Sequence, residues 1–319
     1  MHSFQNLIHS WDNFFFKPRP VDSIALFRII WMSLIFFGVL VEYYNIQDFY
    51  GPHAVASLKS VESEFNYPHL SIFQVFHPSY ENLNLFFIIY LASLVFSIFG
   101  FYTRHAIVVV IICMTSLHQR NIWLLSSSEL LMRITTIMLV FSPCAHAYSI
   151  DSALGKFKNY PDAGREWSSW VLRLIQIQLS VVYVWTVWNK IKGDTWFDGT
   201  AVYYATRLES MWNFPVPFLL DWLPFIKAAT WGTLIIELGL GILIWFKEFQ
   251  KPLIFIGIIF HLGIEYMMSI PFFEIVMILL LMLFIPSEDV KVFVQSLKFR
   301  LNGAKWMKNI ANLKKSGAS

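Results

Sequence analysis

The sequence predicts an all-α integral membrane protein, a bundle of about eight transmembrane helices. Of its 319 residues, 56% are apolar and only 14% are charged, whereas soluble domains carry roughly a quarter charged residues. Several apolar runs also reach the length of about 20 residues that spans a bilayer. The 13 Trp and 31 Phe residues fit aromatic belts and lipid-facing surfaces.

The first 20 residues predict an amphipathic helix that lies in the membrane interface. Apolar side chains recur there at the spacing of one helix face. They are Phe4, Leu7, Ile8, Trp11, Phe14 and Phe15. The stretch has no basic n-region and no small-residue cleavage site, so we expect no cleavable signal peptide. The sequence KPRP at 17–20 separates it from the first span.

Residues 21–288 are predicted to form one transmembrane domain. Its eight predicted spans cover 23–44, 82–100, 104–118, 128–143, 168–190, 218–246, 252–269 and 271–286. The third and fourth spans are short, and QRNIWLLSSS at 119–128 is too polar to face lipid. Such a segment can enter the membrane only where protein or water surrounds it.

Lysine and arginine residues predict the orientation of the bundle, because they favour cytoplasmic loops. Most of them lie in alternate segments at Lys17, Arg19, Arg104, Lys156, Lys158, Arg165, Lys247, Lys251 and the 289–319 tail. The opposite loops, at 45–81, 119–127 and 191–217, carry only Lys59, Arg120, Lys192 and Arg207. We therefore expect a multi-pass protein of the cytoplasmic membrane with both termini in the cytoplasm.

The tail at 289–319 is predicted to be a basic amphipathic segment. One face is apolar and comprises Val290, Phe293, Val294, Leu297 and Leu301. A helix of this kind binds to an anionic lipid leaflet. Membrane lipid is accordingly an expected partner of the protein.

Charged side chains at membrane depth are costly and usually face the bundle interior. The candidates are Arg28, Glu42, Glu129, Arg133, Arg173, Lys190, Lys227, Glu237, His261, Glu265 and Glu274. Arg28 and Arg173 lie near predicted cytoplasmic ends, where their side chains can reach the headgroups. Lys227 and Glu42 lie near the opposite surface, so a structural role is expected for these four.

The remaining charged residues support two hypotheses. Glu129 and Arg133 could pair on one helix face, because they are four positions apart. His261 and Glu265 share another face. The predicted topology places Arg120, Glu129, Arg133, Lys190 and Glu265 in the non-cytoplasmic half, with Glu237 nearer the cytoplasm. These residues form either a buried ion-pair network or one polar cavity that opens away from the cytoplasm.

Several function classes lack support in the sequence. No GxGxxG or Walker A loop is present, and neither HExxH nor paired CxxC motifs occur, so nucleotide and metal sites are not predicted. No nucleic-acid motif is found. Cys113 and Cys144 lie in or at the ends of predicted spans, which argues against a disulfide framework.

Lys190 ends an apolar, Trp-rich run, VVYVWTVWNK. A lysine at this position ordinarily extends to the headgroups. In a dry pocket, however, a lysine can lose its proton and act as a base. Trp185, Trp188 and Trp196 could form such a pocket and stack on a flat ring. The same aromatic residues fit an interfacial belt, which we favour for Trp196.

Four stretches carry a resemblance to a known family. They are FRIIWMSLIFFGVL (27–40) with its following loop, LHQRNIWLLSSSELLMRITTIMLVFSP (117–143), the block at 176–205 and FHLGIEYMMSIPFF (260–273). Together they resemble the family of vitamin K-dependent gamma-glutamyl carboxylases and its bacterial membrane-only relatives, the HTTM domain family. The first is similar to that family's opening helix, and the second resembles its central polar loop and next helix. The third resembles the block that carries the catalytic lysine, and the fourth resembles the histidine-bearing helix.

The resemblance implies a membrane enzyme that uses a reduced naphthoquinone, such as reduced vitamin K or menaquinol, and no metal. In these carboxylases a lysine deprotonates the hydroquinone, and oxygen then converts the hydroquinone into a strong base. That base takes a proton from a glutamate side chain. Carbon dioxide adds to the glutamate, and the quinone leaves as an epoxide. Block matching places Lys190 at that lysine, with His261 and Glu265 as further catalytic candidates. The expected cofactor-binding residues are Arg120, Asn121, Glu129, Arg133, Trp185 and Trp188.

Two departures from the family pattern bear on this expectation. The carboxylases use a histidine in the segment matched to NIWLLSSSEL, where this sequence has none; His118 lies just upstream. The sequence also predicts no large extramembrane domain of the kind that helps carboxylases hold a peptide. A protein or peptide substrate on the non-cytoplasmic side remains part of the expectation.

The alternative function is a non-enzymatic quinone- or lipid-binding membrane module that acts with a separate partner. The missing histidine and the missing domain favour it. A transporter is a third hypothesis. It is weaker, because transporters often contain inverted repeats and broken helices, and this sequence has no repeat and one broken segment at 119–128.

Overall fold

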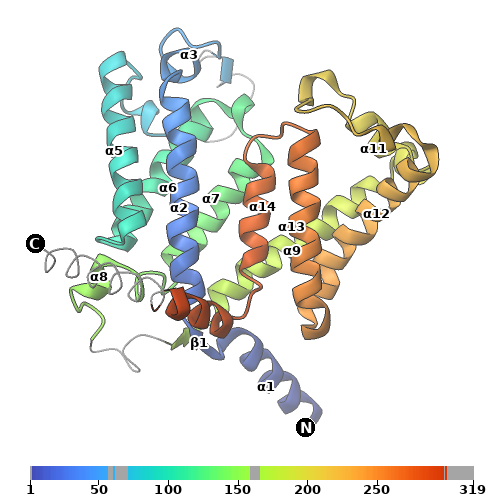
Figure 1. Ribbon diagram of the computed structural model, residues 1–319. Helices are drawn as coiled ribbons and strands as arrows, with labels where there is room; N and C mark the ends of the chain where they lie inside the picture. Colours follow the sequence, from blue (N-terminus) through green and yellow to red (C-terminus); the bar gives the residue numbers. More distant parts are fainter. Residues whose placement is uncertain (1, 57–59, 62–70, 159–165, 298, 300–319) are drawn as a thin grey trace, which may run out of the picture.

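The computed structural model describes residues 2–56, 60–61, 71–158, 166–297 and 299. Within these ranges the chain is mainly helical, with one two-stranded sheet (Figure 1). The predicted all-α architecture is therefore confirmed for the described part of the chain.

A helix is present at each of the eight predicted spans. These helices are α2 (Asp22–Tyr43), α5 (Tyr80–Phe99), α6 (Thr103–Arg120), α7 (Ser127–Val140), α9 (Trp170–Lys190), α12 (Leu223–Ile242), α13 (Lys247–Met267) and α14 (Phe273–Met282). Among the described residues, four helices are long and apolar enough to cross a membrane: α2, α5, α9, and α12 with the 3-10 turn that follows it. This supports a membrane protein, while eight crossings and the sidedness of the termini stay predictions.

Helix α1 (His2–Phe16) precedes these helices in the chain, and shorter elements lie before and between them. The shorter elements are β1 (Pro18–Pro20), α3 (Ile46–Tyr50), η1 (Ile72–Gln74), η2 (Ile122–Leu124), α8 (Ile150–Ala153), β2 (Glu166–Ser168), α10 (Asp194–Phe197), α11 (Ala201–Ala205), η4 (Glu209–Met211), η5 (Phe218–Asp221) and η6 (Leu243–Trp245). Strands β1 and β2 pair antiparallel, with Arg19 opposite Trp167.

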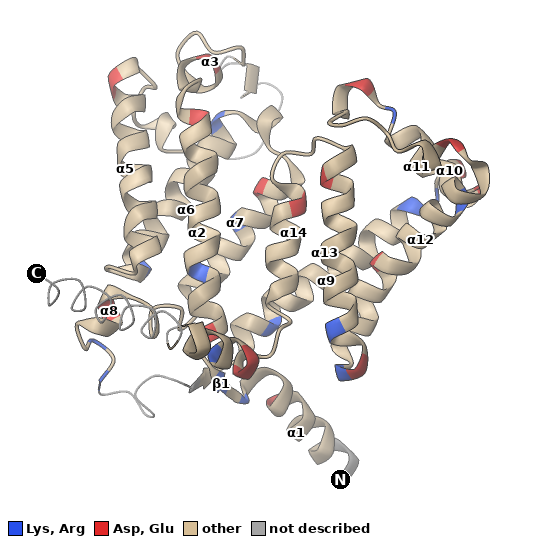
Figure 2. Cartoon of the chain, viewed as in Figure 1, with Lys and Arg blue, Asp and Glu red and all other residues tan. Residues whose placement is uncertain are grey.

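The long helices form two groups that meet at α7 and α14. In one group α2 packs on α5, α5 on α6 and α6 on α7. In the other, α9 packs on α12, and α13 packs on α12 and α14 (Figure 1). Contacts of α14 and α9 with α7 join the two groups. Most of each long helix is uncharged, and charged residues gather near helix ends and in loops (Figure 2).

The N-terminal helix α1 docks on the base of α9. Arg173 Nε donates to the Phe14 carbonyl at 3.2 Å, and Ser169 Oγ donates to the Phe15 carbonyl at 3.2 Å. Leu7 and Trp11 remain 67% and 61% exposed. The expected amphipathic helix is therefore present, with apolar side chains available to a membrane surface. Arg173 binds this helix rather than extending to headgroups.

A buried arginine on α2, Arg28, holds the segment that follows α7. Arg28 has no solvent exposure, and its two terminal nitrogens donate to the carbonyls of Cys144 and Tyr148 at 2.7 and 2.6 Å. The expectation that Arg28 extends to the headgroups is therefore wrong. The segment after α7 supplies both acceptors, while the buried Nε of Arg28 has no hydrogen-bond partner among the described residues.

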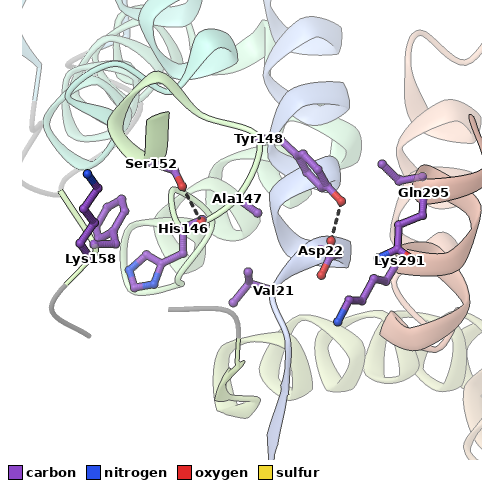
Figure 3. Close-up of a pocket in the computed structure, with 11 residues that line it drawn as sticks. Val21, Asp22, His146, Ala147, Tyr148, Ser152, Lys158, Lys291 and Gln295 are labelled. Atoms are coloured by element: carbon purple, nitrogen blue, oxygen red, sulfur yellow. Dashed lines mark hydrogen bonds between the residues drawn. The ribbon is translucent and has the colours of Figure 1, made fainter. Parts of the chain in front are cut away.

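A polar pocket of about 430 Å³ lies next to this segment (Figure 3). Tyr148 donates its hydroxyl proton to Asp22 at 2.5 Å across the pocket wall. Lys291 and Gln295 of the helix at 287–297 line the far side. The predicted C-terminal amphipathic segment is thus helical where it is described, with Phe293 and Leu297 exposed; Leu301 lies outside the described residues.

Candidate functional site

A cavity of about 770 Å³ lies between α9, α12, α13 and α14. Residues of α11, η5 and the α13–α14 turn complete its lining, among them Leu220 and Met268. Most lining side chains are apolar, and the polar ones include Lys190, Glu237, His261 and Glu274. Its volume falls in the range of about 300–1,000 Å³ typical of small-molecule sites.

The first polar group in the cavity is an ion pair between Lys190 and Glu237. Lys190 occupies the last position of α9, where the negative end of the helix dipole favours a cation. Its Nζ donates to Oε1 of Glu237 and lies 4.9 Å from the centre of the Trp196 ring. The turn that follows, closed by Gly193 N–H to the Lys190 carbonyl at 2.9 Å, leads into α10 and positions Trp196.

Glu237 leaves one carboxylate oxygen unused. Its side chain is buried, and Oε2 has no hydrogen-bond partner among the described residues. An unpaired buried acceptor is costly, so Oε2 is free to accept from a water or from a ligand donor. Gly241, one turn later on α12, allows the helix to approach α9, because a Cβ there would lie 2.9 Å from Val184 Cγ2. This close approach brings Glu237 to Lys190.

The second polar group is a chain of three side chains, Glu274, His261 and Tyr183. His261 Nδ1 bonds to Glu274 Oε2, and His261 Nε2 lies 2.6 Å from the Tyr183 hydroxyl oxygen. All three side chains are buried, with exposures of 1–2%. A carboxylate fixes the tautomer of the histidine it accepts from, so the neutral ring has Nε2 as an acceptor and Tyr183 as its donor.

Each of the two polar groups has one member on helix α9. Tyr183 and Lys190 are seven positions apart on α9, about two turns, and therefore share a face. Lys190 and His261, which were predicted as site residues from separate stretches of sequence, both line the cavity. The arrangement can hold a polar group of a ligand, exchange protons with it and keep its apolar part out of water.

Other predicted residues lie elsewhere. Trp185 and Trp188 face the opposite side of α9, where they are 62% and 54% exposed and line an apolar groove with Phe14 and Trp245. Trp196, expected in the interfacial belt, lines the cavity instead. Glu265 is not among the cavity-lining residues; its backbone carbonyl accepts from Asn213 at 2.9 Å.

The 119–133 region forms a separate polar cluster. Arg120 is buried and donates to the carbonyls of Gly51 and Ala56 at 2.9 and 3.0 Å, and Asn121 donates to the Phe49 carbonyl at 3.1 Å. Both residues therefore fix the first long loop. These backbone contacts account for the burial of both residues without a bound ligand.

The proposed pair of Glu129 and Arg133 is not formed among the described residues. Glu129 instead accepts from the backbone N–H of Ser126 at 2.6 Å and completes a capping box at the start of α7. With Glu42 and His118 it lines a small cavity of about 60 Å³. Of the two hypotheses drawn from the sequence, one shared polar cavity is not found, because these residues line a cavity separate from that of Lys190 and Glu237.

Three cavity residues were missed or misplaced by the sequence analysis. Glu237 was expected nearer the cytoplasmic side but pairs with Lys190. Tyr183 had no assigned role, although its seven-residue spacing from Lys190 was available as a signal. Glu274 was recognised only as a charge within a span, and its pairing with His261 depends on the turn between α13 and α14.

Comparison with known proteins decides the family. The family model described as the HTTM domain matches residues 16–288. This chain belongs to the HTTM domain family. The matched part of the HTTM chain contains the cavity and both of its polar groups.

A curated relative of this HTTM protein is the uncharacterized protein YitO of Bacillus subtilis (strain 168). The two are 27% identical over 123 residues, which cover 36% of this chain and 39% of YitO. The match thus spans well under half the length of that relative. No solved structure matches this chain.

Proposed function

We propose that this HTTM protein is a membrane enzyme that takes a hydroxyl proton from a reduced naphthoquinone, as a step in vitamin K-dependent carboxylase-like chemistry. The observation that supports this most is the Lys190–Glu237 ion pair at an apolar cavity, with Glu237 Oε2 unpartnered among the described residues. The HTTM domain is also the family of the vitamin K-dependent carboxylase.

The residues present fit a hydroquinone. A flat ring suits the apolar lining and the indole of Trp196. A ligand hydroxyl could donate to Glu237 Oε2, which would remove the cost of leaving that buried acceptor unpaired. When bound, a reduced naphthoquinone would supply, on reaction with oxygen, the strong base that takes a proton from a glutamate substrate.

The ion pair changes the role expected for Lys190. In the ion pair, Lys190 Nζ is the donor and Glu237 Oε1 the acceptor, so we assign the role of proton acceptor to the Glu237 carboxylate. The ligand hydroxyl proton would move to Oε2 of Glu237, breaking one O–H bond and forming another. Lys190 would remain positively charged and stabilise the negative charge left at the ligand oxygen.

The Tyr183–His261–Glu274 chain supplies a second proton-transfer route in the same cavity. The Tyr183 hydroxyl is held by His261, which is held in turn by Glu274. Such a chain resembles the general acid–base arrangement in which a carboxylate orients a histidine. We assign it to a proton exchanged at the other polar end of the ligand.

Epoxide formation from menaquinol in oxygenated detergent buffer tests the proposal. The wild type, Lys190→Ala and Lys192→Ala would be compared. Lys192 is the matched control, because it is exposed and its contacts, a 3.5 Å hydrogen bond to Asn189 and the Trp188 ring at 4.9 Å, lie outside the cavity. We expect epoxide from the wild type and Lys192→Ala and a loss of about 100-fold or more in Lys190→Ala.

The competing function is a quinone- or lipid-binding module without chemistry. The same cavity would then bind menaquinol and raise the thermal stability of the protein, since a ligand that favours the native state stabilises it. Stabilisation by menaquinol with no epoxide from the folded wild type would support this function and contradict the enzyme.

A further inference from the structure

Two glycines of the cavity lining, one on α12 and one on α13, have open space in front of them. Gly232 of α12 and Gly263 of α13 both line the cavity, and a Cβ added at either position would meet no atom within 4 Å. Two helices that pack closely through glycines do not leave such space. At this level, therefore, the glycines leave a gap instead of bringing the helices together.

The same two helices are tightly packed at their other end. A Cβ at Gly257 would lie 3.0 Å from Leu240 Cδ2 of α12, and a Cβ at Gly239 would lie 3.3 Å from Leu253 Cδ2 of α13. Gly232 on α12 and Gly263 on α13 lie a similar number of residues from that contact. Because the two helices are antiparallel, the two glycines are nearly at the same level. Figure 1 shows α12 and α13 close together at their connection and diverging away from it.

The outer surface beside the gap is apolar. On α12, Ile235 is 72% exposed, and on α13, Ile259 and Leu262 are 54% and 55% exposed. Helix α12 with its 3-10 extension is long and apolar enough to cross a membrane. Exposed branched side chains on such a helix belong in the hydrocarbon region of the bilayer. A bilayer around these side chains would border the gap.

The gap also adjoins the polar groups of the cavity. Gly232 precedes Glu237 by five positions on α12, and Gly263 follows His261 by two on α13. The buried Oε2 of Glu237, unpartnered among the described residues, points to a ligand with a hydroxyl donor at the inner end. An occupant that satisfies both ends has a polar head and an aliphatic tail.

We propose that the gap at Gly232 and Gly263 is a lateral portal, through which the aliphatic tail of a lipid ligand extends into the bilayer while its hydroxyl-bearing head stays at Lys190 and Glu237. The proposal rests on the proposed function for the identity of the head. It adds that the portal selects for a tail, and that Gly232 and Gly263 determine this selectivity because larger side chains would fill the gap.

The first test needs no ligand. A nitroxide spin label is attached to Gly232→Cys or Gly263→Cys in lipid vesicles; both native cysteines are buried, with exposures of 4% and 1%. We expect collisions with oxygen dissolved in lipid but not with a water-soluble nickel chelate. Ile235→Cys is the lipid-facing control and Lys192→Cys the loop control. Preferential collision of both glycine-site labels with nickel would overturn the portal.

The second test compares binding of two quinols under nitrogen: menaquinol, which has an isoprenoid tail, and the tailless 2,3-dimethyl-1,4-naphthohydroquinone. In the wild type we expect menaquinol to bind at least about tenfold more tightly, because the tail stays in an apolar environment. Gly263→Trp should remove most of this difference while changing tailless binding by less than about threefold. Ile242→Trp, at the exposed end of α12 next to its connection with α13 and outside the cavity lining, should leave both unchanged.

The outcomes separate the portal from the enzyme. Equal binding of the two quinols by the wild type, binding of neither, or equal weakening of both by Gly263→Trp would overturn the portal. Tail-dependent binding that Gly263→Trp abolishes, with no epoxide from the wild type, would keep the portal and refute the enzyme. Epoxide formation without tail dependence would do the reverse.

Discussion

Lys190 and Glu237 form an ion pair although they belong to different helices and lie 47 positions apart in the chain. The last turn of α9 supplies the ammonium group, and α12 supplies the carboxylate at a level where Gly241 allows close approach. Because the Lys190 side chain is only 25% exposed and that of Glu237 only 9%, loss of either partner would leave a poorly solvated charge. The pair is therefore the electrostatic centre of the cavity.

Tyr183→Phe should reduce quinol turnover more than it reduces stability. The change leaves His261 Nε2 without its partner in a buried site, which costs about 1–3 kcal/mol of unfolding free energy. A proton-transfer role adds a rate loss of about 100-fold or more. Thermal unfolding and turnover of the same preparation measure both. Val181→Ala, on an exposed face of α9 outside the cavity lining, is the control, and full turnover in Tyr183→Phe would contradict the assigned role.

Gly241→Leu should destabilise the protein, whereas Gly263→Leu should not. A Cβ at Gly241 would lie 2.9 Å from Val184 Cγ2 and 3.4 Å from the Ser180 carbonyl, so a larger side chain would separate α9 from α12. Overpacking of this kind costs about 1–3 kcal/mol. Gly263 faces open space. Thermal denaturation in detergent compares the variants, and equal losses at both positions would show that the open side of the cavity is not present.

Acid should weaken the contact between the α8 segment and α6. Burial alone would raise the pKa of the Asp151 carboxyl, but hydrogen bonds from Lys156 and Thr103 outweigh it and hold that pKa below its usual value of 3.8. A lowered pKa contributes stability above the unfolded-state value, and this stability is lost as pH falls through the folded-state value. The effect therefore lies below about pH 4.

Asp151→Ala tests this contact directly. It removes acceptors from the Tyr102 and Thr103 amides, which lie at 3.1 and 2.8 Å, and should cost about 1–3 kcal/mol at neutral pH. The difference from the wild type should shrink in acid. Asp12→Ala, at an exposed position of α1, serves as the control. A difference that stays constant down to pH 3 would contradict the role of the ionised carboxylate.

Much of the helical arrangement could be predicted from the sequence. Apolar runs bounded by polar or glycine-rich turns placed a helix at every predicted span, because burial and backbone hydrogen bonding both require one there. Lys190 and His261 were singled out as polar residues within apolar surroundings, together with the family resemblance. These predictions use one segment of sequence at a time, so they do not require knowledge of how the helices pack.

The pairing of side chains between helices could not be predicted in the same way. Glu237 was assigned a depth by counting along α12, whereas its contact with Lys190 depends on where α9 and α12 cross. The direction of Trp185 and Trp188 depends on the rotation of α9, because a Trp-rich run offers aromatic residues on every face. Glu129 is different, because its contact could have been predicted. The spacing of Ser126 and Glu129 is that of a capping box, but the sequence analysis predicted a pairing with Arg133 instead.

The central claim is that Lys190 and Glu237 act as one unit in removing a proton from the ligand. The most direct measurement is a double-mutant cycle of menaquinol turnover with the wild type, Lys190→Ala, Glu237→Gln and the double variant. If the pair acts as a unit, each single variant should lose about 100-fold or more, and the double variant should be nearly as active as the worse single one. Losses that multiply in the double variant, or full turnover in either folded single variant, would contradict the claim.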